Sequence, residues 1–399
     1  MSQTITVTVG PKNAQFVGEN HLALQAALDY VARLRGGTVR ILPGTYQMGN
    51  SLFLRSNIHI VGSGDDTVLR KCASARTRLT EDTDWYDTAV KVKDPSIFTV
   101  GGGILLRGKS PHFDKSQFVK RTVTAIEGNV ITIDRDPREN FWIDMKAEAA
   151  TLFPVVTGDY VNDVVIEDLT IDGNRAQNEN LNGNYGGGIF IQDCDRITLR
   201  GITSRDNNSD GISYQVCDDV VVEGCRCLDN TDLGIHAGSG SQRTRVMGNT
   251  ITGGSVGFFF CWGVRHGVVS DNTIQDANVG ISIGHRDTDN LIQRNTVSGS
   301  KQHGILFREH PIGRRDPHRN VFEDNAILDC GARGDCVAIE MLGTARGVTL
   351  RGNRIGDTRR RSRIRKRIGL RIGPKIKSLK LQDNDFEKMD EDVVDLRGK

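Results

Sequence analysis

The sequence predicts an all-β solenoid, a parallel β-helix of about 23 residues per coil with a capping helix at its N-terminal end. Six glycines recur at intervals of 23 or 24 residues: Gly188, Gly211, Gly234, Gly257, Gly280 and Gly304. In each coil the first and third residues after the glycine are apolar. The 45 glycines and 9 prolines suit many tight turns on a repeating framework. A unit this short cannot bury its own apolar face, so it must stack on its neighbours.

The first predicted element is an amphipathic helix over residues 20–36. Asn20 can cap its N-terminus, and Gly36 and Gly37 end it. Its apolar stripe consists of Leu24, Ala27, Leu28, Val31 and Leu34. A solenoid leaves an apolar end open, and this helix is expected to cover it.

Three regions follow from the pattern along the chain. Residues 1–94 are expected to hold the cap helix and the first coils, and residues 159–399 the main β-helix. Residues 95–158 interrupt the repeat and are interpreted as a β-rich excursion packed on the early coils. Within it, the alternation around Glu127, Gly128 and Asn129 predicts a β-hairpin. Irregular coils are the alternative for this region.

The N-terminal sequence resembles the opening of pectate-lyase-superfamily proteins. The resemblance lies in residues 24–27 (LQAA), 36–39 (GGTV), 42–46 (LPGTY) and 60–62 (IVG). The repeats from residue 160 onward resemble the right-handed parallel β-helix that follows in such proteins. The resemblance implies this fold, which is used by lyases, glycoside hydrolases, epimerases and phage adhesins. No catalytic motif of pectate lyases or polygalacturonases is evident, so no catalytic residue is carried over from the family.

The glycine register also predicts which side chains point inward. The pairs one and three residues after each glycine are expected to form apolar ladders inside the coils: Ile189/Ile191, Ile212/Tyr214, Ile235/Ala237, Phe258/Phe260, Ile281/Ile283 and Ile305/Phe307. Six asparagines share another inward position, and their stacked amides are predicted to form a structural corner: Asn249, Asn272, Asn295, Asn325, Asn353 and Asn384.

The outward face of the first strand carries a different polar group in each coil, which favours a site over a structural wall. The candidate catalytic residues are His236, His285, Asp287, Arg308 and Glu309. The candidate substrate-binding residues are Gln192, Ser213, Gln215, Ser239, Arg243, Trp262, Arg265, His266, Arg286 and Asp289. Longer turns over residues 173–187 and 309–319 flank this face and are expected to form cleft walls.

Three functions fit this face. A lyase that cleaves a uronate-containing glycan by β-elimination needs cations for the carboxylate and a base near neutral pH, which the arginines and histidines offer. A glycoside hydrolase or transferase needs two carboxyl groups, for which Asp287, Asp289 and Glu309 are candidates, with Asp193 and Asp210 further along the helix. A non-catalytic glycan-binding β-helix is the third alternative. The excess of arginine and histidine over carboxylates favours the lyase.

Composition narrows the partners. The net charge of +2 gives no strong field that would attract nucleic acid, and no apolar stretch is long enough to span a membrane. The N-terminus lacks the features of a secretion signal, so a cytoplasmic location is expected, with a removed signal as the alternative. The eight cysteines form no CxxC pair and are expected to be reduced. No cofactor is expected. Calcium is left open as an alternative, but it is unsupported because the face lacks the clustered carboxylates that calcium prefers.

Two further features concern association. The strand at residues 393–396 has no evident cap, so a homo-oligomer, conceivably a trimer, is expected as an alternative to a monomer. The basic run Arg359–Arg367 is interpreted as a solvated loop, with an anionic polymer or a partner subunit as the alternative ligand.

Overall fold

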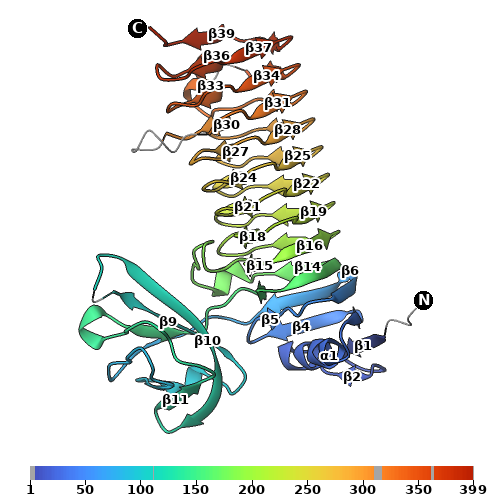
Figure 1. Cartoon of the computed structure of the whole chain (residues 1–399), viewed down its shortest axis with the longest axis vertical. Helices are drawn as coiled ribbons and strands as arrows, with labels where there is room; N and C mark the ends of the chain where they lie inside the picture. Colours follow the sequence, from blue (N-terminus) through green and yellow to red (C-terminus); the bar gives the residue numbers. More distant parts are fainter. Residues whose placement is uncertain (1–4, 111, 310–316, 361–363, 399) are drawn as a thin grey trace.

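The computed structural model describes residues 5–110, 112–309, 317–360 and 364–398, and its main body is a tall stack of β-coils (Figure 1). The helix α1 (His21–Arg33) lies at the N-terminal end of the stack, and the coils then continue to the C-terminus. A separate group of strands projects from the side of the early coils. The predicted solenoid with an N-terminal cap helix is therefore confirmed.

Over the described residues the strands form sheets of 22, 11 and 6 strands. The 11-stranded sheet consists of β5 (Leu52–Phe53), β13 (Val156–Asp159), β15 (Ile189–Gln192), β18 (Ile212–Gln215), β21 (Leu233–Ala237), β24 (Val256–Phe260), β27 (Val279–Ile283), β30 (His303–Phe307), β33 (Gly334–Met341), β36 (Ile364–Ile372) and β39 (Glu391–Asp395). The 6-stranded sheet consists of β7 (Arg76–Arg78), β8 (Ala89–Lys91), β9 (Gly103–Lys109), β10 (Ser116–Glu127), β11 (Val130–Ile133) and β12 (Glu148–Ala150).

The 22-stranded sheet wraps the remaining sides of the coils. It consists of β1 (Thr6–Gly10), β2 (Phe16–Val17), β3 (Gly37–Ile41), β4 (Gly44–Met48), β6 (Ile58–Lys71), β14 (Asn162–Asp172), β16 (Asp195–Arg200), β17 (Thr203–Arg205), β19 (Val221–Glu223), β20 (Arg226–Leu228), β22 (Arg245–Met247), β23 (Thr250–Thr252), β25 (Val268–Ser270), β26 (Thr273–Gln275), β28 (Leu291–Gln293), β29 (Thr296–Ser298), β31 (Val321–Glu323), β32 (Ala326–Leu328), β34 (Thr349–Arg351), β35 (Arg354–Gly356), β37 (Lys380–Gln382) and β38 (Asp385–Glu387).

The pairing of the 11-stranded sheet confirms the predicted register. Its strands are parallel, and Ile189, Ile212, Ile235, Phe258 and Ile281 are successive partners. All five side chains are fully buried in one continuous core. The polar residues between them therefore lie on the outward face, as period-2 alternation requires.

The asparagine ladder is confirmed as well. The amide of Asn272 donates to Asn295 Oδ1 at 2.8 Å and to the Val246 carbonyl at 2.9 Å, and the same pattern runs from Asn249 to Asn384. Two shorter ladders that were not predicted join Asn207 to Asn230 and Asn290 to Asn320. These amides satisfy the backbone of the corners that the coil turns around.

The cap helix forms because its ends and its apolar stripe agree. Asn20 Oδ1 accepts the backbone N–H groups of Leu22 and Ala23, which is the predicted cap. Four of the five predicted stripe residues are fully buried, but Leu34 is 50% exposed. Leu34 follows the last helical turn as the C-terminal cap residue, so its side chain leaves the apolar face.

The excursion is a group of antiparallel strands with its own apolar core. The predicted hairpin is present, because Glu127 of β10 pairs with Val130 of β11. The sheet includes β7 and ends with β12, so the excursion spans residues 76–150 rather than 95–158. The missed strands are only three residues long, too short for an alternation pattern to be recognised.

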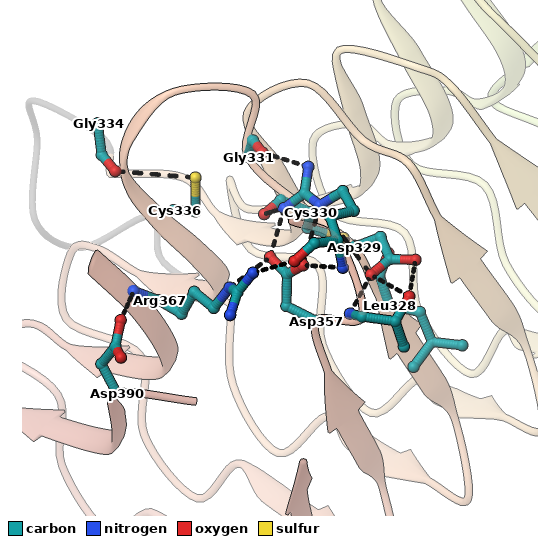
Figure 2. A network of polar contacts seen from close by, with 11 residues as sticks. Leu328, Asp329, Cys330, Gly331, Gly334, Cys336, Asp357, Arg367 and Asp390 are labelled. Carbon is teal, nitrogen blue, oxygen red and sulfur yellow. Dashed lines mark hydrogen bonds and ion pairs between the residues drawn. The ribbon is translucent and has the colours of Figure 1, made fainter. Parts of the chain in front are cut away.

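Several described residues of the basic run form ion pairs within the fold (Figure 2). Arg359 and Arg367 both face the carboxylate of Asp357, and Arg359 also donates to the carbonyls of Cys330 and Gly331. Arg365 forms an ion pair with Asp335 at 2.7 Å. The described part of the run therefore ties neighbouring coils together; residues 361–363 lie outside the described residues.

Candidate functional site

The outward face of the 11-stranded sheet is partly covered by the long turn 173–187. Ser213 Oγ donates to the Gly183 carbonyl at 2.9 Å, and the Asp210 carboxylate packs against Gly183. Ser213 is consequently fully buried, which corrects the expectation that it lies on an open stripe. A cavity lies on each side of this covered coil. We call them the N-terminal cavity and the central cavity.

The N-terminal cavity has a volume of about 290 Å³ and lies between the early coils and the excursion. Its lining combines cationic, acidic and aromatic side chains, among them Arg55, Lys120, Arg121, Arg135, Asp134, Asp159, Phe53, Phe153 and Phe190. Gln192 also lines it, so this predicted substrate-binding residue is placed in a cavity. The volume is close to the lower end of the range of about 300–1,000 Å³ typical of small-molecule pockets.

Lys120 is the most perturbed cation of the N-terminal cavity. It lies on β10, its Nζ is 4.2 Å from the centre of the Phe190 ring, and Nζ donates to the Tyr185 carbonyl. Burial lowers the pKa of Lys120 to about 8, with the charge of Asp159 acting in the opposite direction. A lysine in this state has a usable fraction of neutral amine near neutral pH.

The other charged groups of this cavity differ in whether their side chains are already bonded to the protein. Arg121 donates to the carbonyls of Arg135, Asp136 and Pro137 and thereby holds that turn. The Arg135 side chain is exposed and makes no hydrogen bond with the described residues. Burial and the nearby charge of Asp193 raise the pKa of Asp159. Arg135 is thus available to an anion, and Asp159 is tuned toward its protonated form.

The central cavity is wider, about 410 Å³, and is lined by the turn 180–184 and by the first residues of several coils. Asp210, His236, Phe259, Cys261 and Trp262 form its protein wall together with that turn. The cavity brings the predicted site residues His236 and Trp262 together with Asp210, which was named only as a candidate carboxylate further along the helix. It also includes Phe259 and Cys261, which had no predicted role.

His236 is held by its neighbours on both ring nitrogens. Nδ1 lies 2.8 Å from Asp210 Oδ2, the ring packs edge-on against Phe259, and the side chain is 4% exposed. Burial lowers the pKa of His236, but the hydrogen bonds and charges of Asp210 and Cys261 outweigh this and raise it to about 9. Burial also raises the pKa of Asp210. His236 is therefore protonated near neutral pH, which does not suit the predicted role of a free base.

Arg308 reaches from its own coil across the preceding one. It donates to Ser282 Oγ at 2.7 Å and to the Phe260 carbonyl at 2.6 Å, and its guanidinium lies 4.2 Å from the centre of the Phe259 ring. Asp287 lies 3.6 Å from it. Arg308 thus packs over the outward-facing side chains of two earlier coils, and its catalytic role stays a prediction.

Asp287 has a structural position. It is fully buried and accepts the backbone N–H groups of Gly263, Val264 and Gly284 at 2.9–3.0 Å. Burial raises its pKa to about 6 against the opposing effects of Arg308 and these N–H groups. The structure corrects the expectation that its carboxylate faces substrate, because all its neighbours are turn groups and Arg308.

Several predicted binding residues lie on a corner beside the face, not on it. Arg243, His266 and Asp289 occupy the same coil position with positive φ angles of 55°, 56° and 62°. Arg243 pairs with Asp219 of the preceding coil, and Asp289 pairs with Arg319 of the following one. This corner is a ladder of inter-coil ion pairs. Arg265 precedes His266 directly and is bridged through its backbone to Gln242 and Thr288, so it belongs to the same corner.

The remaining predicted residues divide between the cavity rim and exposed positions. Gln215 Oε1 accepts the Ser239 N–H at 2.8 Å, which places both beside His236. The ring of His285 packs against Trp262 at 5.1 Å. Exposed Arg286 follows His285, and Glu309 pairs with Lys375 at 3.1 Å. Most of the predicted wall 309–319 lies outside the described residues.

Sequence reasoning missed Lys120 and gave Cys261 no role in the site, whereas it named Asp210 only as a candidate carboxylate further along the helix. Lys120 lies in the non-repeating excursion, where no register exists to place it. In the glycine register Cys261 occupies an outward position, four residues after Gly257. It was nevertheless interpreted as a reduced, buried thiol without a role in the site. Asp210 directly precedes a register glycine, and nothing in the repeat indicates that the turn 173–187 would fold over it.

The described residues contain no group of three or more His, Cys, Asp or Glu side chains arranged to hold a metal ion. No helix in the described ranges has the length and apolar character needed to cross a bilayer. All eight cysteines are free thiols.

The fold and the repeat define a protein of the right-handed β-helix class. The family model described as "Right handed beta helix region" matches residues 155–266 and 259–363, together more than half of the chain. The chain belongs to this family. A search of curated protein sequences finds no match.

Solved structures share the fold at low sequence identity. The mannuronan C-5 epimerase AlgE4 A-module of Azotobacter vinelandii is 14% identical with a TM-score of 0.59, covering 98% of this chain and 100% of its own. The surface protein and adhesin PfbA of Streptococcus pneumoniae is 12% identical with a TM-score of 0.57, covering 94% and 95%. A glycoside hydrolase is 11% identical with a TM-score of 0.54, covering 96% of both chains. These proteins show that the fold supports enzymes and an adhesin alike.

Proposed function

We propose that the chain is a carbohydrate-active enzyme that cleaves a uronate-containing glycan by β-elimination in the N-terminal cavity. The proposed site adjoins the outward sheet face expected from the sequence. Its reacting groups, however, differ from the catalytic residues predicted from the sequence. The observation that carries it is the presence of Lys120, whose pKa is lowered to about 8, and of Arg135 in the lining of one cavity.

β-Elimination makes three demands on a site. A cation must neutralise the uronate carboxylate, a base must remove the proton beside it, and an acid must protonate the leaving oxygen. The free guanidinium of Arg135 suits the carboxylate because it binds such groups bidentately. The neutral amine of Lys120 suits the base, and Asp159, with its raised pKa, suits the acid. Phe53 and Phe190 offer apolar surface for a sugar ring.

Glycoside hydrolysis is the second candidate, because two carboxyl groups line the same cavity. Asp159 with its raised pKa would be the acid, and Asp134 the base or nucleophile. Asp134 accepts the Thr122 N–H at 2.8 Å, which fixes the orientation of its carboxylate. This reaction does not need the lysine, which separates the two candidates experimentally.

The test compares Lys120→Met with wild type on alginate, polygalacturonate and hyaluronan. Release of unsaturated uronate is followed by ultraviolet absorbance, and new reducing ends are measured in parallel. Loss of the base is expected to lower the rate by about 10²–10⁴. Lys109→Met, an exposed lysine of β9, is the matched control and should behave as wild type.

Two results would overturn the lyase. One is reducing ends without unsaturated product, which supports the hydrolase and should then depend on Asp159→Asn. The other is unsaturated product formed equally well by Lys120→Met. Binding of these glycans without any product would instead support the non-catalytic alternative.

A further inference from the structure

The N-terminal cavity continues onto the surface of the excursion through two further hollows. Two of its lining residues, Arg121 and Arg135, also line a second hollow of about 500 Å³. Tyr86 lines this second hollow and also a third one, of about 430 Å³. The further lining residues are Thr88, Asp136 and Arg138 in the second hollow and Asp84, Trp85 and Asn140 in the third. We call the second and third hollows together the excursion track.

Two turns that lie side by side build the excursion track. The first carries Trp85 and Tyr86 at its tip and is closed by a hydrogen bond of 3.0 Å from its fourth N–H to its first carbonyl, over residues 84–87. The second turn follows β11, and the Arg138 N–H donates to the Trp85 carbonyl at 3.1 Å. Arg121 holds this second turn by donating to three of its carbonyls. The backbone of the track is therefore fixed by the fold itself.

Two large aromatic side chains lie in solvent on this fixed backbone. Tyr86 is 77% exposed and Trp85 is 43% exposed. Clustered exposed apolar surface is typical of interaction sites, and such rings offer a flat face together with a polar edge. Asp84 and Asn140 add hydrogen-bonding groups beside them in the third hollow. This combination suits a sugar, whose ring has an apolar face and hydroxyl groups at its edge.

The second hollow adds positive charge to the track. Three arginines and one aspartate line it. Arg138 Nε lies 3.0 Å from Asp136 Oδ1, whereas the exposed Arg135 side chain makes no hydrogen bond with the described residues. A guanidinium binds a carboxylate bidentately, so this part of the track suits an anion of that kind. A chain of sugars that carry carboxylates matches both the aromatic and the cationic part.

We propose that the excursion track binds the sugars of an acidic polysaccharide that continue beyond the N-terminal cavity. The preferred substrate is accordingly a long polyuronate chain rather than a short oligosaccharide. The inference rests on the proposed function, because the cavity must hold the same chain at its reacting sugar. Arg121 and Arg135 lie at the junction, since both line the cavity and the track. The excursion, which lies outside the repeat, thereby selects the substrate by its length and charge.

Affinity electrophoresis of the full chain tests this binding. Native gels contain alginate, polygalacturonate, hyaluronan or the neutral polymer dextran, and every chain carries Lys120→Met so that the polymer stays intact. Mobility in a polymer-free gel corrects for changes in net charge. Tyr86→Ala and Arg138→Gln should each weaken binding about tenfold. The matched controls, Tyr30→Ala in α1 and Arg78→Gln in β7, change exposed residues that line none of the three hollows and should bind as their parent.

Chain length gives a second measurement that needs no change in the track. Calorimetry compares a disaccharide and a decasaccharide of the polymer that retards the chain most. The parent should bind the decasaccharide at least about tenfold more tightly, because only the longer ligand reaches the track. Tyr86→Ala should reduce that difference and leave the affinity for the disaccharide unchanged. Equal affinity of the parent for both lengths would overturn the proposal.

The outcomes separate the excursion track from the lyase. Weaker binding by either track variant supports the track, even if the wild-type chain releases no unsaturated product. Unchanged binding by both variants overturns the track, and a wild-type chain that still releases unsaturated product then leaves the lyase in place. Retardation by none of the three acidic polymers, or equal retardation by dextran, also overturns the track.

Discussion

Asn295 tests how much the asparagine ladder contributes to the β-helix. Its side chain is 1% exposed and makes four hydrogen bonds. Oδ1 accepts from Asn272 N and Nδ2 at 3.0 and 2.8 Å, and Nδ2 donates to the Val269 carbonyl and Asn325 Oδ1, both at 2.9 Å. At about 1 kcal/mol for each bond, Asn295→Ala should lower the local opening free energy by about 4 kcal/mol. That change corresponds to about 10³-fold faster amide exchange.

Hydrogen exchange with mass spectrometry is the suitable assay, since long repeat arrays seldom unfold in one step. Peptides that cover the coils around Asn295 should lose protection, whereas distant coils should change less because each coil contacts only its neighbours. Asn184→Ala, at an exposed position, is the control. An increase in exchange below about threefold at the ladder would refute the hydrogen-bond reasoning.

Two further predictions concern Lys120 and Asp287. Because the pKa of Lys120 is about 8, lyase rate should rise about tenfold between about pH 7 and 9, and Lys120→Met should show no such rise. Burial raises the folded-state pKa of Asp287 to about 6, above its usual value of about 3.9, so the folded chain binds the proton more tightly. Thermal stability should therefore fall as pH rises through this window, and Asp287→Asn should flatten that dependence.

The repeat made the fold predictable because each coil must match its neighbours. An inward residue such as Ile235 touches its counterparts in the coils before and after, so its position follows from counting. The same counting placed the asparagine corner. It failed where the coil leaves the strand: Arg243 and Asp289 were assigned to the face, although their positive φ angles turn them onto a corner of ion pairs. Counting residues fixes a place along the coil but not the direction of the turn.

The candidate site was less predictable because non-repeating segments complete it. Lys120 comes from the excursion, and the turn 173–187 buries Ser213 and brings Gly183 onto Asp210. A solenoid face alone is a shallow surface, since each coil adds the same relief. The excursion and the long turn convert that surface into enclosed cavities, where burial can lower the pKa of a lysine.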